Sequence, residues 1–208
     1  SNAINMSLIA VTTPVFILLL ARIFLHERLS ARQALGILIT LFGVLILISN
    51  GEPRRLLAID FVPGDLWMLI ASVAFAGYSL LLQYKPSDID DRLFIVITFL
   101  LGLVYLTPFY LWELWHLEPA QFSTTVITAL LYVAVFASLV AIYFWNRAVK
   151  LIGPSRTGLF YSLIPVFSSL LAFLLLEQAA TLVHLFSLLL IIGGLVYANR
   201  TSRLETRP

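Results

Sequence analysis

The amino-acid sequence predicts an all-α integral membrane protein of about seven transmembrane helices. Apolar side chains make up 61% of the 208 residues and charged side chains only 12%. Soluble domains are closer to half apolar and a quarter charged. The charged residues also recur at nearly regular intervals, so the chain between them forms long apolar stretches. A soluble core could not hide this much apolar surface, and lipid must therefore surround the protein.

Seven apolar stretches are long enough for helices of roughly 20 residues, which cross a hydrocarbon core of about 30 Å. In chain order, the predicted spans are 1–21, 33–51, 66–84, 93–112, 119–146, 157–176 and 178–199. They are apolar all round rather than alternating, which disfavours transmembrane strands. Turn-forming sequences separate several of them, as in residues 50–53 (NGEP) and 153–155 (GPS).

Basic residues are concentrated in the loops on one predicted side of the membrane. That side carries Arg22, Arg28, Arg32, Lys85, Arg92, Arg147, Lys150, Arg156, Arg200, Arg203 and Arg207, and the other side carries Arg54 and Arg55. Because cytoplasmic loops are enriched in Lys and Arg, the first side is predicted to be cytoplasmic. The C-terminus is then cytoplasmic, and the N-terminus of this chain is extracytoplasmic.

Two parts of the chain resemble one another. Residues 14–21 (PVFILLLA) return as residues 165–172 (PVFSSLLA). The glutamate and glycine that follow are equally spaced in both copies, from Glu27 to Gly43 and from Glu177 to Gly193. Because leucine-rich helices match easily by chance, the proline, glutamate and glycine carry this signal.

The two copies are predicted to cross the membrane in opposite directions, because one lies in the first span and the other in the sixth. Such an inverted repeat is typical of secondary transporters, whose substrate site lies between the halves. Three spans lie between the two-span copies and none precedes the first copy, so the parent is expected to have ten helices in two halves of five. The predicted parts are the end of the first repeat, an extracytoplasmic linker, the second repeat and a cytoplasmic tail, at residues 1–50, 51–64, 65–199 and 200–208.

Several motifs carry a resemblance to a known family. They are Pro14, residues 25–29 (LHERL), Gly36, Gly43, residues 143–148 (YFWNRA), residues 153–156 (GPSR), Pro165, Leu176-Glu177 and Gly193-Gly194. With these motifs the chain resembles helices four to ten of the EamA family of the drug/metabolite transporter superfamily. Phe186 departs from the pattern, because a glycine matching Gly36 is expected there. Ser1-Asn2-Ala3 fits either the family's link into its fourth helix or the remainder of a removed tag.

The resemblance implies a secondary transporter that exports small metabolites such as amino acids by alternating access. It also implies a location in the cytoplasmic (inner) membrane. A small-molecule substrate and the lipid bilayer are the expected partners, and nucleic acid is not. The oligomeric state is left open.

Composition excludes several other classes. The chain has no cysteine and three scattered histidines, which argues against a metal site, a cofactor or a thiol-based enzyme. Seven helices also fit a receptor or a retinal-binding pump, but the last span lacks the lysine that a Schiff base needs. A seven-helix receptor or a membrane assembly subunit without transport activity is the alternative function.

Polar side chains within the spans are candidates for substrate contact, because such groups are costly in lipid. In the third span, Ser72, Ala76, Ser79 and Gln83 fall on one helix face, with Tyr78 beside it. We therefore expect Tyr78, Ser79 and Gln83 to line the substrate path. The alternative is helix packing through small residues, with each hydroxyl bonded to its own backbone.

The fifth span offers Tyr143, Trp145 and Asn146 near its predicted cytoplasmic end. The two aromatic residues can line the mouth of the path or belong to the aromatic belt at the membrane surface. The Asn146 amide can both donate and accept hydrogen bonds to a zwitterion, or it can cap the helix.

In the sixth span, Tyr161, Pro165 and Ser168 share one face, with Ser162 and Ser169 beside it. Tyr161 and Ser162 are expected to contact substrate. A proline within a span frees the carbonyl four residues earlier, which here belongs to Tyr161, and permits a kink.

In the first span, Pro14 is likewise expected to free the carbonyl of Ala10, four residues earlier, and to permit a kink. Pro14 and Pro165 occupy equivalent positions in the two repeats and are therefore expected to act as gates. Static bends that improve packing are the alternative.

Four glycines within the spans are expected to permit close helix contacts, namely Gly36, Gly43, Gly193 and Gly194. Two glutamates at span ends, Glu27 and Glu177, are expected to cap a helix or to pair locally, Glu27 with Arg22 or Arg28. No acidic residue lies near the middle of a span, so the sequence leaves open whether transport is coupled to protons.

Overall fold

The computed structural model describes residues 3–27, 30–54, 62–116, 123–176 and 181–200, and every long regular element within these ranges is helical. The α-helices are α1 (Ala3–Phe24), α2 (Ala31–Ser49), α4 (Pro63–Leu81), α5 (Asp91–His116), α6 (Thr124–Tyr132), α7 (Ala141–Ile152), α8 (Pro154–Phe160), α9 (Ile164–Leu176) and α10 (Leu182–Arg200). Three short helical segments of other types are η1 (Leu82–Tyr84), η2 (Val133–Val140) and η3 (Tyr161–Leu163). The predicted all-α membrane fold is confirmed.

The helices follow the predicted spans in order, and three spans contain changes of helix type, the third because α4 ends in the 3₁₀ turn η1. The fifth span is continuous from α6 through the π-helical turn η2 into α7, and the sixth is divided into α8 and α9 by the 3₁₀ turn η3. Within the described residues, five helices are long and apolar enough to cross a membrane, and α1 adds the shorter apolar segment Ile9–Phe24. Glu177 and the tail at 201–208, for which we made predictions, lie outside the described residues.

Local hydrogen bonds explain where two of the helices begin. The Ser30 hydroxyl accepts from the Gln33 amide N–H, while the Gln33 side chain accepts from the Ser30 N–H, forming a capping box before α2. Before α4, the Asp65 carboxylate accepts from the Val62 N–H at 2.9 Å, and Pro63 takes the first helical position. The turn sequences between the apolar stretches therefore also supply the helix starts.

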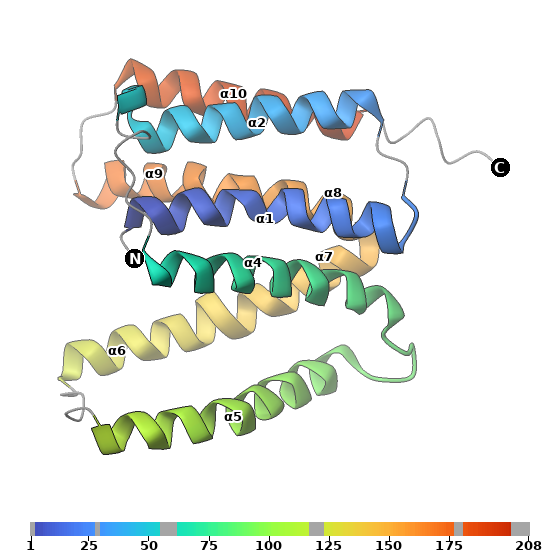
Figure 1. Ribbon diagram of the computed structural model, residues 1–208, viewed down its shortest axis with the longest axis vertical. Helices are drawn as coiled ribbons and strands as arrows, with labels where there is room; N and C mark the ends of the chain where they lie inside the picture. The colour runs from blue at the N-terminus through green and yellow to red at the C-terminus, as the bar shows by residue number, and fades with distance from the viewer. Residues whose placement is uncertain (1–2, 28–29, 55–61, 117–122, 177–180, 201–208) are drawn as a thin grey trace. The chain divides into compact units, whose positions relative to one another are not determined.

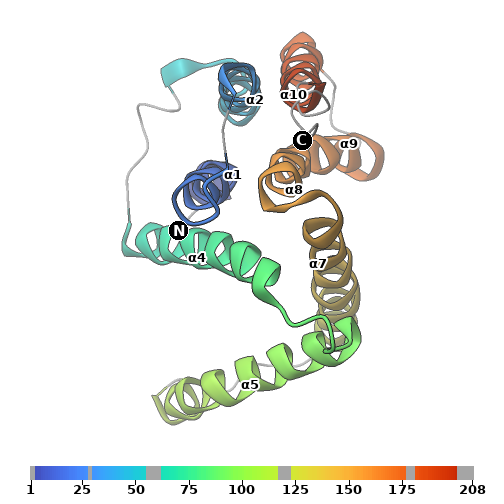
Figure 2. The same cartoon turned by 90° about the vertical axis from the view of Figure 1, so that its right-hand side faces the viewer.

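By packing, the chain forms two compact units, one made of residues 1–83 and 152–208 and the other of residues 84–151. This division differs from the predicted repeat boundaries, which remain predictions. In the first unit α2 packs along α10, and α1 packs against α4 and α8 (Figures 1 and 2). The buried side chains that join these helices form two clusters, Val11, Val44, Leu47 and Ile191 in one and Leu18, Leu159, Leu195 and Ala198 in the other.

Glycines set the distance between α2 and α10, which run antiparallel. A Cβ atom placed on Gly36 would lie 2.7 Å from the Gly194 carbonyl oxygen, and one on Gly43 would lie 2.9 Å from Leu190 Cβ. Gly194 is equally confined, because its Cβ would lie 2.6 Å from the Gly36 carbonyl oxygen. These three glycines lie where the predicted close contacts require them.

The prediction of a close helix contact is wrong for Gly193, because a Cβ atom added there would meet nothing within 4 Å. Successive residues of a helix point about 100° apart, so Gly193 faces away from α2 when Gly194 faces toward it. Phe186, where a glycine was expected, is 55% exposed and also points away from the contact.

The second unit is largely exposed along α5 and α6, as expected for helices that contact lipid. Its polar end is organised around Asp91, whose carboxylate lies 2.6 Å from the Lys85 ammonium and 3.6 Å from that of Lys150. The Lys85 ammonium also lies 5.6 Å from the centre of the Phe94 ring. These contacts tie the loop after η1 to the start of α5 and the end of α7.

Candidate substrate site

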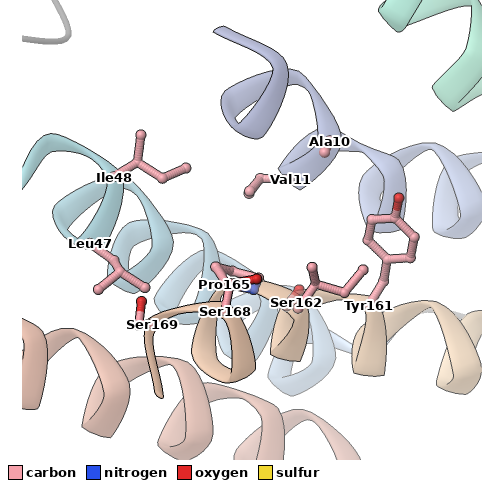
Figure 3. Close-up of a pocket in the computed structure, with 10 residues that line it drawn as sticks. Ala10, Val11, Leu47, Ile48, Tyr161, Ser162, Pro165, Ser168 and Ser169 are labelled. Atoms are coloured by element: carbon pink, nitrogen blue, oxygen red, sulfur yellow. The ribbon is translucent and has the colours of Figure 1, made fainter. Parts of the chain in front are cut away.

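The first unit contains a cavity of about 280 Å³ between α1, the end of α2 and the η3–α9 segment (Figure 3). Its lining residues are Ala10, Val11, Leu47, Ile48, Tyr161, Ser162, Ile164, Pro165, Ser168 and Ser169. The candidate residues of the sixth span, Tyr161, Ser162 and Pro165, are therefore brought together at one cavity. Ser168 and Ser169, which were placed on or beside the same face, join them.

The division of the sixth span shapes this cavity. Pro165 cannot donate to the carbonyl of Tyr161, and the helix tightens into the 3₁₀ turn η3 just before it. The Tyr161 carbonyl accepts from the Ile164 N–H instead. The change of helix type falls just before Pro165, and the kink stays a prediction. The expectation that the Tyr161 carbonyl is left free is wrong, because the tighter turn provides another donor.

Pro14 behaves differently, since α1 runs through it as one helix from Ala3 to Phe24. Pro14 is fully buried, and Ala10, whose carbonyl loses its usual donor, lines the cavity. The two prolines of the repeat therefore both act on residues of the same cavity wall.

Tyr161 extends from η3 toward α1 (Figure 3). Thr13 of α1 is 1% exposed and lies next to the Tyr161 phenol. The Tyr161 ring also lies 5.9 Å from the ring of Phe75, which in turn lies 6.2 Å from that of Tyr78. Two helices, α1 and α4, thus hold the ring of Tyr161 at the cavity.

Phe75 was missed by sequence reasoning, although a signal was present. It lies one turn before Ser79 and three residues before Tyr78, so it borders the polar face predicted for the third span. An aromatic residue in an apolar span stands out less than a hydroxyl. The predicted residue Tyr78 is therefore connected to the cavity wall through Phe75.

The other candidates of the third span have different surroundings. Ser79 is fully buried and donates to the Phe75 carbonyl at 2.9 Å, and Ser72 donates to the Met68 carbonyl at 3.0 Å. Gln83 departs from their face, because the helix tightens into η1 and leaves its side chain exposed. The prediction of one continuous face through Gln83 is therefore wrong.

The candidates of the fifth span, Tyr143, Trp145 and Asn146, lie on α7 in the second unit. The Arg147 guanidinium donates to the Tyr143 hydroxyl at 3.3 Å, and the Tyr143 ring meets the Phe144 ring edge to face at 5.5 Å. None of the three predicted residues is among those that line the cavity.

The cavity wall is mainly apolar, contains several hydroxyl groups and carries no formal charge. Four of the ten lining residues bring hydroxyl groups, and none of the ten is Asp, Glu, Lys, Arg or His. No group of three or more metal-ligating side chains forms within the described ranges. Hydroxyls both donate and accept hydrogen bonds, so the wall suits a polar solute without excess charge of either sign.

Long apolar helices packed around a small cavity with hydroxyl groups in its wall are typical of a multi-pass membrane transport protein. Residues 1–49 and 62–200 match the EamA-like transporter family, and the chain belongs to this family. The resemblance seen in the sequence is thereby confirmed.

Several curated proteins are similar to this chain. The uncharacterized transporter YyaM of Bacillus subtilis is 28% identical over 173 residues, which cover 83% of this chain and 57% of that protein. The uncharacterized transporter YetK of the same organism is 26% identical over 195 residues, which cover 88% of this chain and 56% of that protein. The thiamine-repressible mitochondrial transport protein THI74 of Saccharomyces cerevisiae is 27% identical over 161 residues, which cover 71% of this chain and 42% of that protein. The chain thus spans less than two thirds of the length of each of these relatives.

A solved crystal structure has the same fold. It superposes with a TM-score of 0.79 at 22% sequence identity and covers 98% of this chain and 69% of that one. This likeness shows the fold.

Proposed function

We propose that the protein is a secondary transporter that exports small metabolites such as amino acids by alternating access, and that the cavity forms part of its substrate site. The observation that carries this proposal is the cavity itself. Four hydroxyl groups and no charged side chain lie in its mainly apolar wall, which also includes Pro165 and Ala10, the residue four positions before Pro14.

The chemistry of the wall favours a zwitterion. A neutral amino acid offers an ammonium donor and a carboxylate acceptor, and the hydroxyls of Tyr161, Ser162, Ser168 and Ser169 can serve both. A fixed positive or negative side chain would repel one end of such a solute. The cavity of about 280 Å³ is slightly smaller than the usual range for ligand sites, which favours a compact metabolite.

The packing of α2 against α10 supports the inverted repeat. These helices follow the two repeated segments, and they run antiparallel, as two units of opposite orientation require. With the basic loops placed in the cytoplasm, the end of the first unit that holds Glu27 faces inward, in a cytoplasmic membrane. The division into repeats at 1–50 and 65–199 belongs to this proposal.

The remaining predicted residues have subsidiary roles in this scheme. Tyr78 supports the Tyr161 wall through Phe75. Tyr143, Trp145 and Asn146 are proposed to line the mouth of the path, as the sequence suggested.

Transport by the purified protein in proteoliposomes tests the proposal. We expect counterflow of radiolabelled neutral amino acids in preference to nucleosides and sugars. Replacing Tyr161 by Phe removes one hydroxyl, and losing a hydrogen bond to a charged group should weaken apparent affinity about tenfold or more. Tyr105→Phe is the matched control, because Tyr105 is 74% exposed on α5.

Each outcome bears on a separate part of the proposal. Unchanged affinity in Tyr161→Phe would remove the cavity from the substrate path. Counterflow of nucleosides or sugars alone would overturn the amino-acid assignment. Absence of counterflow with every solute would overturn transport by this chain.

A further inference from the structure

A hydrogen bond between distant segments closes one end of the first unit. The Glu27 carboxylate, just after α1, accepts from the hydroxyl of Ser155 at the start of α8, a residue 128 positions later. The sequence had suggested a local partner for Glu27. Among the described residues, Arg22 does donate to Glu27, but to its backbone carbonyl, at 3.4 Å.

The backbone on both sides presents these two groups to each other. After α1 the chain reverses through His26, which has a left-handed φ of 53°, and the Glu27 N–H returns to the Ala21 carbonyl. Opposite, Gly153 has a φ of 83°, which favours glycine, and a Cβ atom there would lie 4.0 Å from the Glu27 carboxylate. The contact therefore depends on two specific turns.

Between this contact and the cavity, α1 and α8 are tightly packed. Ile17 is fully buried, and a Cβ atom on Gly158 would lie 3.1 Å from its side chain. Leu18 and Leu159, 4% and 3% exposed, pack in one cluster beside them. We call these four residues the α1–α8 seam. It separates the cavity, which begins at Tyr161, from the Glu27 end of the unit.

We propose that the hydrogen bond between Glu27 and Ser155 is the latch of a gate whose closed wall is the α1–α8 seam. Alternating access requires each side of the substrate site to close in turn. A charge-assisted hydrogen bond between the two helices stabilises the state closed on this side, and it must break when the seam opens. The role in transport rests on the proposed function, whereas closure of the seam can be measured without any substrate.

The absence of cysteine from the chain makes the test direct. A single Leu159→Cys reporter places a thiol in the seam, and its reaction with a membrane-impermeant maleimide is timed in vesicles of both orientations. We expect slow labelling in the reporter protein. Adding Glu27→Gln should raise the rate about tenfold, from one side of the membrane only, because the charged acceptor is lost.

Matched variants separate a latch from general loosening. Ser155→Thr keeps a hydroxyl and should leave labelling slow, whereas Ser155→Ala should speed it as Glu27→Gln does. A second reporter, Ser168→Cys in the cavity, is labelled with the maleimide from the other side of the membrane. Its labelling rate should be the same with and without Glu27→Gln. If Glu27→Gln does not fold, Ser155→Ala, which removes a single oxygen atom, decides the question.

The outcomes also separate the gate from the proposed function. Equal Leu159→Cys labelling in folded variants with and without the hydrogen bond overturns the latch, even if amino acids are transported. Faster labelling from both sides, or loss of folding in both variants, overturns it too, because the contact would then hold the fold rather than a gate. Faster labelling from one side supports the latch, even if counterflow fails with every solute and the proposed function falls.

Discussion

Two adjacent glycines of α10 provide a direct test of the helix contact described above. Gly194 faces α2, and a Cβ atom there would lie 2.5 Å from the Thr40 hydroxyl oxygen and 2.6 Å from the Gly36 carbonyl oxygen. A Cβ atom on Gly193 would meet nothing within 4 Å. Replacing each by alanine therefore adds the same methyl group to the same helix in opposite surroundings.

The expected magnitudes follow from two separate effects. Alanine is a better helix former than glycine by about 0.8–1.0 kcal/mol, and both variants gain this amount. Only Gly194→Ala also forces α2 and α10 apart, and overpacking of this kind costs about 1–3 kcal/mol. The confining atoms at Gly36 and Thr40 include backbone atoms, which cannot rotate away. We therefore expect Gly194→Ala to be less stable than Gly193→Ala by about 1–3 kcal/mol.

Reversible unfolding in mixed detergent micelles, titrated with a denaturing detergent and followed by circular dichroism, measures this difference. Gly193→Ala should unfold at the same or a higher detergent fraction than the unaltered protein, and Gly194→Ala at a lower one. If the two variants unfold together, or if Gly193→Ala is the weaker, then α10 does not meet α2 through the face assigned here.

Two further changes test the cavity and the second unit. Pro165→Ala supplies the missing amide donor and should straighten the turn before it. We expect the free energy of unfolding to rise by up to about 3 kcal/mol while counterflow slows, whereas Pro108→Ala, in a residue of α5 that is not among those lining the cavity, should leave counterflow unchanged. Asp91→Asn leaves the Lys85 ammonium, whose side chain is 7% exposed, without its carboxylate. Because the Asp91 side chain is 37% exposed, detergent unfolding should show a loss of about 1–3 kcal/mol in the free energy of unfolding, against about 0.5 kcal/mol or less for the exposed Asp88→Asn. Equal losses would contradict a structural ion pair.

Part of the candidate site was predictable because its residues lie on one helix. Tyr161, Ser162 and Pro165 are close in sequence, and helical periodicity alone places them on neighbouring faces. The same reasoning failed at Gln83, because it assumed an unbroken α-helix where the chain tightens into a 3₁₀ turn. Periodicity is reliable only while the helix type is constant.

The sequence by itself determined the membrane location, the order of the spans and the family. These properties depend on local hydrophobicity and on short motifs, and neither requires knowledge of which helices meet. The basic loops also predict an orientation, and the proline, glutamate and glycine spacing predicts the repeat.

Only the tertiary structure decided which groups touch. It distinguished Gly194 from Gly193, introduced Phe75 as the support of Tyr161, and paired Glu27 with a serine 128 residues away. The physical reason is that all sides of a transmembrane helix are apolar, so hydrophobicity does not mark the face that packs against protein. Contacts in such a bundle are selected by the close fit of side chains, which exists only after the helices have assembled.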